Sequence, residues 1–137
     1  MRETAEEVDQ SPLYQTVHHQ LIASALVTKI GHEINPAFQI GCMIAGIPMY
    51  PLTCNPDNVL EAMQEERKSL LFGDVHARGA YPGYIKRYFE ENNIRIVFEK
   101  DNEKILKYTV DFISFSYYMS GCATADEEKT FRRREIS

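Results

Sequence analysis

The chain has 137 residues, 44% hydrophobic and 26% charged, which excludes disordered and fibrous classes and fits one domain. Its net charge of -5 argues against nucleic acid or an anionic membrane as partner, since both bind clustered positive charge. Three cysteines without paired spacing predict no disulfide framework and no metal site, and fit a reducing cytoplasm. We expect neither a membrane span nor a signal peptide.

A long helix is predicted between the start signal Ser11-Pro12, read as an N-cap followed by proline, and the stop signal Asn35-Pro36. His18 and His19 are adjacent, so they point about 100° apart and cannot chelate one metal together. We expect a structural or solvent role for both. An apolar stripe at three- and four-residue spacing is expected to be buried: Leu13, Val17, Leu21, Ile22, Ala25, Leu26, Ile30 and Ile34.

The almost continuously apolar run from Phe38 to Ala45 predicts a central parallel strand. Cys42 lies inside it with no basic neighbour in sequence, so we interpret it as a core residue rather than a nucleophile. The stretch Gly46 to Pro51 is rich in helix and strand breakers and predicts a rigid connector.

Asn55-Pro56 begins a second helix, whose carboxylates are expected to form a solvated face. Gly73 to Gly79 is predicted to be a polar turn. Asp74 and His76 within it could orient an imidazole, but no nucleophile stands beside them, so a structural role is favoured. The inward side of the helix is expected to comprise Val59, Leu60, Met63, Leu70 and Leu71.

A third helix is predicted from Pro82 to Asn92-Asn93, with Tyr84, Ile85, Tyr88 and Phe89 on its apolar side. An extended segment and a brief helix capped by Asp101 should follow.

The stretch Thr109 to Ser120 predicts a strand buried on both faces, ending in hydroxyl and aromatic side chains. Because side chains alternate along a strand, Ser116 and Tyr118 should share a face. The carboxyl end of such a strand is where α/β folds carry their chemistry, so these residues form the candidate site wall. Alternatively, Tyr117 and Tyr118 are strand aromatics that only pack.

The gap between the two strong strands is about five times the minimal parallel crossover of roughly a dozen residues. Barrel enzymes elaborate such connections, but two strands cannot close a barrel of eight. The order therefore predicts an α/β slice of a larger fold. The charged segment 126–137 predicts a disordered tail after residues 1–125.

Several stretches in series resemble the family 1 glycoside hydrolases, and most closely their 6-phospho-β-glucosidase branch. They cover nearly all of the chain up to about Ala125. The matching stretches are Tyr14-Gln15-Thr16-Val17-His18-His19-Gln20-Leu21-Ile22-Ala23-Ser24-Ala25-Leu26, Gly31-His32-Glu33-Ile34-Asn35-Pro36, Ile40-Gly41-Cys42-Met43-Ile44-Ala45, Tyr50-Pro51-Leu52-Thr53-Cys54-Asn55-Pro56-Asp57, Phe72-Gly73-Asp74-Val75-His76-Ala77-Arg78-Gly79-Ala80-Tyr81-Pro82 and Val110-Asp111-Phe112-Ile113-Ser114-Phe115-Ser116-Tyr117-Tyr118-Met119-Ser120.

The resemblance implies part of a (β/α)8 TIM barrel, about strands five and six with their flanking helices, incomplete as a barrel. It implies a cytoplasmic enzyme without metal or cofactor that hydrolyses 6-phosphorylated β-glucosides. Two glutamates, about 5 Å apart, would act with retention of configuration. The partner would be a phosphorylated β-glucoside in the intact enzyme, and exposed strand edges of the slice would favour self-association.

The resemblance places both catalytic glutamates outside this chain. The family's acid/base lies in an Asn-Glu motif at the end of strand four, before Met1, and its nucleophile lies in a Glu-Asn-Gly motif beyond Ser137; neither motif is expected here. Tyr118 matches the family tyrosine that hydrogen-bonds the nucleophile. Ser116 takes the position of an asparagine near the acid/base in many members, so its role is less defined.

Two hypotheses therefore stand side by side. In the first, the chain is a catalytically incomplete piece of a 6-phospho-β-glucosidase. In the second, it is a non-catalytic α/β binding domain or a degenerate gene product. A third is assembly with another chain that carries the missing strands. A free-standing domain should melt cooperatively as a monomer, whereas a barrel slice should expose apolar faces and aggregate.

Overall fold

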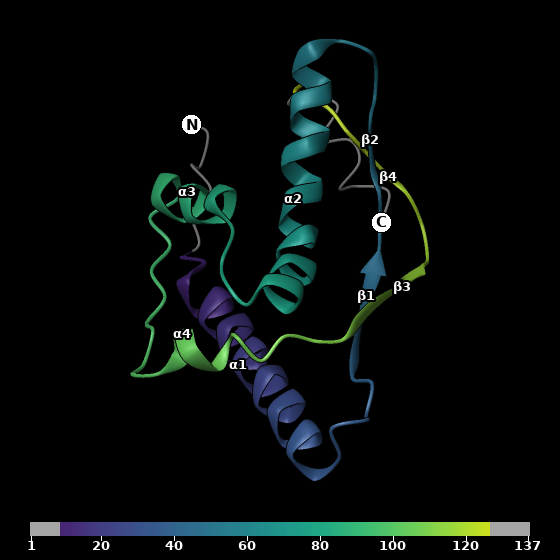
Figure 1. Cartoon of the computed structure of the whole chain (residues 1–137). Coiled ribbons are helices and arrows are strands. Elements are labelled where there is room, and N and C mark those ends of the chain that lie inside the picture. The colour runs from purple at the N-terminus through teal and green to yellow at the C-terminus, as the bar shows by residue number, and fades with distance from the viewer. Residues whose placement is uncertain (1–8, 127–137) are drawn as a thin grey trace.

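The computed structural model describes residues 9–126, so the predicted tail lies outside the described part except for Asp126. Four helices and four strands follow one another along this part of the chain (Figure 1). They are α1 (Ser11–Ile34), β1 (Gly41–Gly46), β2 (Met49–Pro51), α2 (Pro56–Arg78), α3 (Gly83–Glu91), α4 (Asn102–Ile105), β3 (Phe112–Tyr117) and β4 (Gly121–Ala123).

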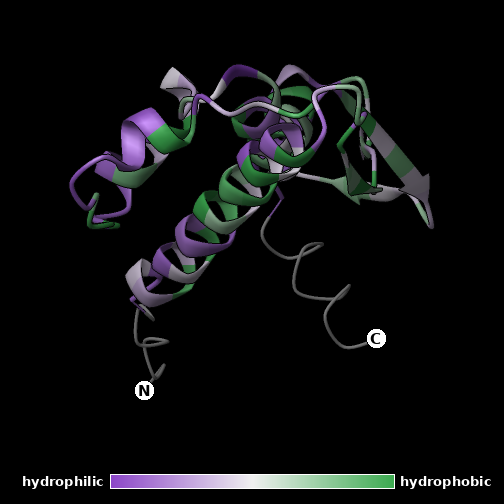
Figure 2. Ribbon diagram, turned by 60° about the horizontal axis from the view of Figure 1, so that its bottom comes forward, coloured by the Kyte–Doolittle hydropathy of each residue, from purple (hydrophilic) through white to green (hydrophobic). Residues whose placement is uncertain are grey.

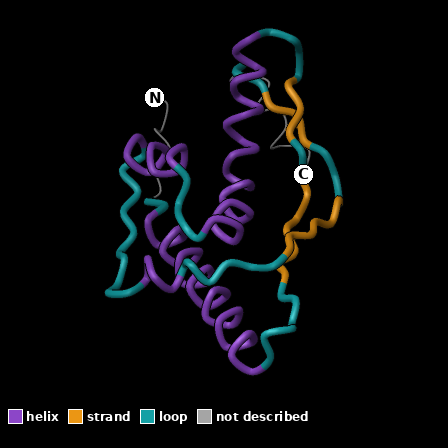
Figure 3. The backbone as a smooth tube through the Cα atoms, in the orientation of Figure 1, coloured by secondary structure: helices purple, strands orange, loops and turns teal. Residues whose placement is uncertain are grey.

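The strands form two parallel pairs, β1 with β3 and β2 with β4. In the first pair the register runs from Gly41 opposite Phe112 to Gly46 opposite Tyr117. The strands lie on one side of α2 and the other helices on its opposite side (Figures 1 and 3). This arrangement confirms an α/β fold with long parallel crossovers, and within residues 9–126 the strands form two open two-stranded sheets and not a closed barrel.

The predicted helix boundaries at Asn35, Asn55 and Asn92 are confirmed, and one start signal is wrong. Asn35 ends α1, and the Asn55 side chain caps α2 by accepting a hydrogen bond from the Asp57 amide at 3.0 Å. Ser11, however, is the first helical residue of α1 and not its cap. The upstream carboxylate of Asp9 accepts from the Ser11 amide at 2.9 Å, and Asp9 thereby satisfies one of the free amides at this helix end.

The predicted polar turn at 73–79 is wrong, because α2 continues to Arg78 and ends at Gly79. Gly79 has a φ of 63°, and a Cβ there would collide with the Leu106 carbonyl oxygen. Within the helix, Arg78 pairs with Asp74 one turn earlier at 3.0 Å. Gly73 lies inside the helix and packs closely on β1, with the Ile44 side chain only 3.1 Å from where a Cβ would stand.

The hydrophobic core lies where α1, α2, α3 and the segment around Ile94 and Leu106 meet. Leu71 on α2, at 1% exposure, is among its most buried residues. The apolar side predicted for α3 is confirmed, with Ile85 and Phe89 buried. Among the described residues the fully buried members of this core are Leu21, Leu71, Val75, Tyr81, Ile85, Phe89, Ile94 and Leu106.

Much of the apolar surface that the sequence predicts to be buried is exposed. In α1, Leu21 and Ala25 are buried but Leu13, Leu26, Ile30 and Ile34 are not. In α2 the residues expected to face inward are exposed except Leu71, and Ala62 and Val75 are buried instead. Apolar residues recur along the strands and the long helices in Figure 2.

The prediction that the strand around Phe115 is buried on both faces is wrong for this chain. Phe112, Ile113 and Phe115 in β3 are exposed, Phe115 to 75%. The physical reason is that β3 has one neighbouring strand, β1, in the described residues. A barrel strand is buried by its neighbours and by an outer layer of helices, and most of that surround is absent here.

The connector around Pro48 and the region after Gly121 contain two strands that sequence reasoning missed. β2 and β4 are three residues each, and the Leu52 amide extends their pairing by donating to the Ala123 carbonyl at 2.9 Å. Within residues 9–126, no helix is both long enough and apolar enough to cross a membrane.

Candidate functional site

The carboxyl ends of β1 and β3 meet at one edge of the open sheet. Because the two strands are parallel, Gly46 and Tyr117 end them side by side, and β2 and β4 continue the same edge. In parallel β/α folds this edge carries ligands and chemistry.

Ser116 is the more enclosed of the two predicted site residues. It is half-buried in β3, and its hydroxyl lies 3.1 Å from the sulfur of Met43 on β1. Tyr118 is the first residue after β3, with its side chain 64% exposed. Both therefore belong to the carboxyl edge of the sheet, and their catalytic roles stay predictions.

Tyr118 lies in the short link that joins β3 to β4, and each of these two strands is paired with a different partner. The link runs from Tyr117, the last residue of β3, to Gly121, the first residue of β4. The Tyr117 hydroxyl and the Ser120 hydroxyl are 2.9 Å apart, so one donates to the other across the link. The Gly121 amide then donates to the Pro48 carbonyl at 2.9 Å. The Gly121 end of the link is thus held to the connection that follows β1, and the Tyr117 end is paired with Gly46 of β1.

Asn58 in the first turn of α2 is a part of this edge that sequence reasoning missed. Its Nδ2 donates to Thr53 Oγ1 at 2.8 Å, while its Oδ1 accepts from Thr124 Oγ1 at 3.0 Å and from the Ala125 amide at 2.9 Å. The sequence carries little signal for it, because an asparagine near a helix start reads as an exposed polar residue.

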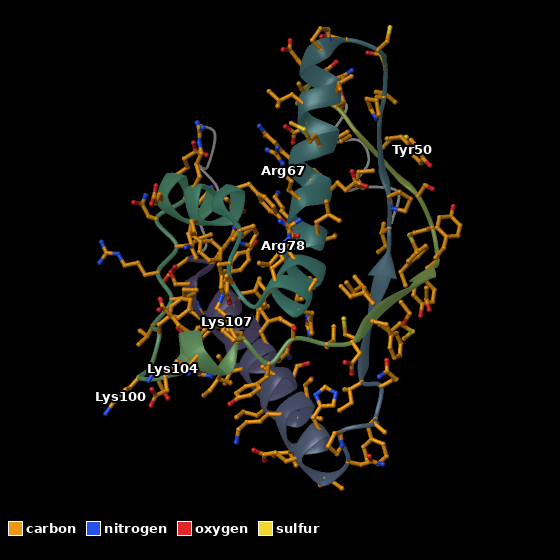
Figure 4. All side chains as sticks on the ribbon, viewed as in Figure 1. Tyr50, Arg67, Arg78, Lys100, Lys104 and Lys107 are labelled. Atoms are coloured by element: carbon orange, nitrogen blue, oxygen red, sulfur yellow. The ribbon has the colours of Figure 1, made fainter. Side chains whose placement is uncertain are left out.

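The basic side chains labelled in Figure 4 lie away from this edge. Arg67 and Arg78 belong to α2, and Lys100, Lys104 and Lys107 surround α4, whereas Tyr50 lies on β2. Arg78 and Lys104 are paired with Asp74 and Asp101, at 3.0 Å in each case. These basic residues therefore do not line the carboxyl edge of the strands.

One Asn-Glu pair does occur in the chain, at Asn102-Glu103, so the expectation that this dipeptide is absent is wrong. It begins α4 instead of following a strand, and Glu103 is exposed. Asn102 is buried and its Oδ1 accepts from the Glu99 amide at 2.9 Å. The pair therefore has a structural place and not that of the family's acid/base motif.

His18 is fully buried and joins three segments, as a structural histidine would. Asn102 Oδ1 is an acceptor, so the His18 Nε2–H, 2.9 Å away, donates to it. The Tyr81 hydroxyl, 3.1 Å from His18 Nδ1, then donates to that nitrogen. His19 is exposed and close to the Gln15 amide, at 2.8 Å.

His76 is half-buried between α1 and α2 and also has a structural place. Its Nδ1–H donates to the Phe72 carbonyl at 2.7 Å, and its Nε2 accepts from the Ser24 hydroxyl at 3.0 Å. The cavity beside this pair has a volume of about 10 Å³, too small for a substrate. The geometry therefore supports a structural role for His76, as predicted.

Asp111 fastens the opposite, amino end of β3. Its Oδ2 accepts from the Ile40 amide and from His32 Nε2, both at 2.8 Å. The hydrogen bond from the Ile40 amide is the largest cause that lowers the pKa of the Asp111 carboxyl, and the hydrogen bond from His32 is the next. Residues at this end of a barrel strand serve stability.

Cys42 is half-buried in β1, and burial raises the pKa of its thiol, which disfavours the reactive thiolate. Within residues 9–126, no group of three or more histidine, cysteine or acidic residues is placed to hold a metal ion.

Long parallel crossovers, an open sheet and a site-like carboxyl edge define this chain as a piece of a β/α barrel. The sequence matches the profile described as Glycosyl hydrolase family 1 over residues 5–136, and the chain belongs to this family. The resemblance inferred from the sequence is thereby confirmed.

Relatives of known name agree with the 6-phospho-β-glucosidase branch. A 6-phospho-beta-glucosidase from Clostridium longisporum is 64% identical over 123 residues, which are 90% of this chain and 26% of that protein. A phospho-cellobiase from Klebsiella oxytoca is 52% identical over 125 residues, 91% of this chain and 27% of that protein. The chain thus spans about a quarter of the length of these relatives.

Solved structures agree on the fold. A beta-glucosidase from Exiguobacterium marinum matches with a TM-score of 0.69 at 21% identity, over 86% of this chain and 28% of that one. A rice beta-glucosidase matches with a TM-score of 0.64 over 77% of this chain and 22% of that one. The open sheet is therefore a partial piece of the family barrel.

Proposed function

We propose that this chain supplies barrel strands five and six of a 6-phospho-β-glucosidase, an enzyme that hydrolyses the O-glycosyl bond of 6-phosphorylated β-glucosides. The observation that carries the proposal is the 64% identity to an enzyme of that name over 90% of the chain. The proposal includes the cytoplasmic location that the family resemblance implies.

The proposed reaction uses two glutamates that we assign to parts of the barrel outside this chain. One protonates the leaving oxygen while the other attacks the anomeric carbon, and water then hydrolyses the glycosyl-enzyme. In this scheme the Tyr118 hydroxyl donates a hydrogen bond to the attacking carboxylate, and Ser116 lines the wall near the acid/base. The position of both residues at the carboxyl edge of the sheet supports these roles.

Without either glutamate the 137-residue chain alone should not turn over substrate, because it cannot form the covalent intermediate. Its exposed apolar strands should instead promote self-association. The exposed Phe112, Ile113 and Phe115 of β3 support this second expectation.

A chimera tests the proposed function. The matching 123-residue segment of the Clostridium longisporum enzyme is replaced by that of this chain, and nitrophenol release is measured with 6-phosphorylated and unphosphorylated nitrophenyl β-glucosides. We expect turnover of the phosphorylated substrate by the chimera and none by the 137-residue chain. A folded chimera without activity, or near-normal turnover by the chain alone, would contradict the proposal.

A further inference from the structure

Asn58 joins two connections that are far apart in sequence. One is the segment after β2, reached through the Thr53 hydroxyl, and the other is the segment after β4, reached through the Thr124 hydroxyl and the Ala125 amide. Both segments follow the strand ends that make up the candidate site. One side chain thus bridges the two neighbouring loops at this edge.

The amide of Asn58 suits this place because it is both donor and acceptor. Its side chain is 8% exposed, so each polar atom needs a partner within the protein. The Nδ2 group donates toward Thr53, and the Oδ1 atom accepts from the two groups of the 124–125 segment. Alanine would remove all three hydrogen bonds, and the Ala125 amide would lose its acceptor to solvent.

The segment held by Asn58 is connected to Tyr118 through one short strand. β4 lies between them, and it is paired along its length with β2. The link from Tyr117 to Gly121 is therefore held at its β3 end by pairing with β1, and at its β4 end by pairing with β2. Asn58 adds a hold on the segment just after β4, so its loss leaves β4 held by β2 alone, and we expect β4 and the link to shift.

We propose that Asn58 is a positioning residue, which holds β4 in place and thereby sets the position of Tyr118 at the carboxyl edge of the sheet. This inference rests on the proposed function, because Tyr118 must act in the reaction for its position to matter. A misplacement of about 1 Å in such a group can lower a rate by about 100-fold.

The first measurement tests the hydrogen bonds of Asn58 themselves, in the 137-residue chain, and needs no enzymatic activity. Amide exchange at Ala125 is compared in the parent, in Asn58→Ala and in Asn102→Ala. Asn102 is the control for loss of a buried asparagine elsewhere in the fold: its oxygen accepts from the Glu99 amide and from His18 Nε2–H, and it lies on α4 before β3. We expect at least tenfold faster exchange at Ala125 in Asn58→Ala alone. Equal exchange in parent and Asn58→Ala would overturn the proposal.

The second measurement follows the reaction in the chimera with the 6-phosphorylated aryl β-glucoside. We expect Asn58→Ala to lower kcat at least tenfold with KM within about twofold, and Asn102→Ala to leave kcat within twofold at the same temperature. Asn58→Asp keeps the acceptor oxygen, so its kcat should stay within about threefold of the parent. Unchanged kcat in Asn58→Ala, or an equal loss in Asn102→Ala, would overturn the positioning role. An inactive parent chimera would instead contradict the proposed function. The exchange measurement would then decide whether Asn58 holds the segment after β4.

Discussion

Phe115 and Leu71 should respond differently to the surroundings of the chain. Phe115 on β3 is 75% exposed and Leu71 on α2 is 1% exposed. An aromatic side chain can bury about 200 Å², so a quarter of that is about 50 Å² and contributes about 1.2 kcal/mol. Phe115→Ala should therefore cost the 137-residue chain about 1 kcal/mol. Leu71→Ala removes a fully buried side chain and should cost about 2–5 kcal/mol.

In the chimera the ranking should change. If strands of the barrel cover β3, Phe115 becomes a core residue and its truncation should cost about 3–5 kcal/mol, while the cost for Leu71→Ala stays the same. The assay is urea unfolding followed by helical circular dichroism, with each variant compared to its own parent. An equal cost of Phe115→Ala in the chain and in the chimera would refute the reasoning that the rest of the barrel covers the Phe115 side of β3.

Three further outcomes are expected. Tyr118→Phe in the chimera should lower turnover with little effect on urea unfolding, and an unchanged rate would remove Tyr118 from the site. The pKa of Asp111 is lowered in the folded chain, so its carboxylate stabilises the fold above the pKa of the unfolded carboxyl, about 3.9, and this contribution is lost as the pH falls further. Asp111→Asn should therefore flatten the loss of stability below about pH 5. An acid unfolding profile unchanged from the parent would contradict this expectation. Burial raises the pKa of Tyr14 and Tyr81 to about 12, so both should stay neutral at about pH 11 while exposed tyrosines ionise. The stability that these neutral side chains contribute is present below about pH 10 and is lost as the pH rises toward 12. Complete ionisation of all tyrosines in the folded chain by pH 11, seen by ultraviolet absorbance, would contradict their burial.

Local signals in the sequence predicted the helices well where their chemistry is short-range. Asn35-Pro36 and Asn55-Pro56 mark the end of α1 and the start of α2, because proline and a capping side chain act within a few residues. The turn predicted at 73–79 is wrong, because α2 continues through Gly73 to Arg78. Gly73 packs closely against Ile44, which is a long-range contact that no local pattern contains.

Burial could not be predicted from the apolar pattern of β3 for a related reason. The pattern around Phe115 fits a strand covered on both faces, but the described residues provide it with one paired neighbour. The short strands β2 and β4 also left no local signal, because three residues are too few for a period of two to show. Asn58 was missed because its partners Thr124 and Ala125 lie more than 60 residues away in sequence.

The parallel pair β1–β3 also sets the order in which this chain can fold. Ile40 and Asp111, which begin the pairing, are 71 residues apart, so the contact order of the sheet is high. At a translation rate of about 5–20 residues per second, β1 waits about 4–14 s for its partner strand to be synthesised. During that interval the helices can gather around Leu71, while the edge of β1 is open to pairing with another nascent chain.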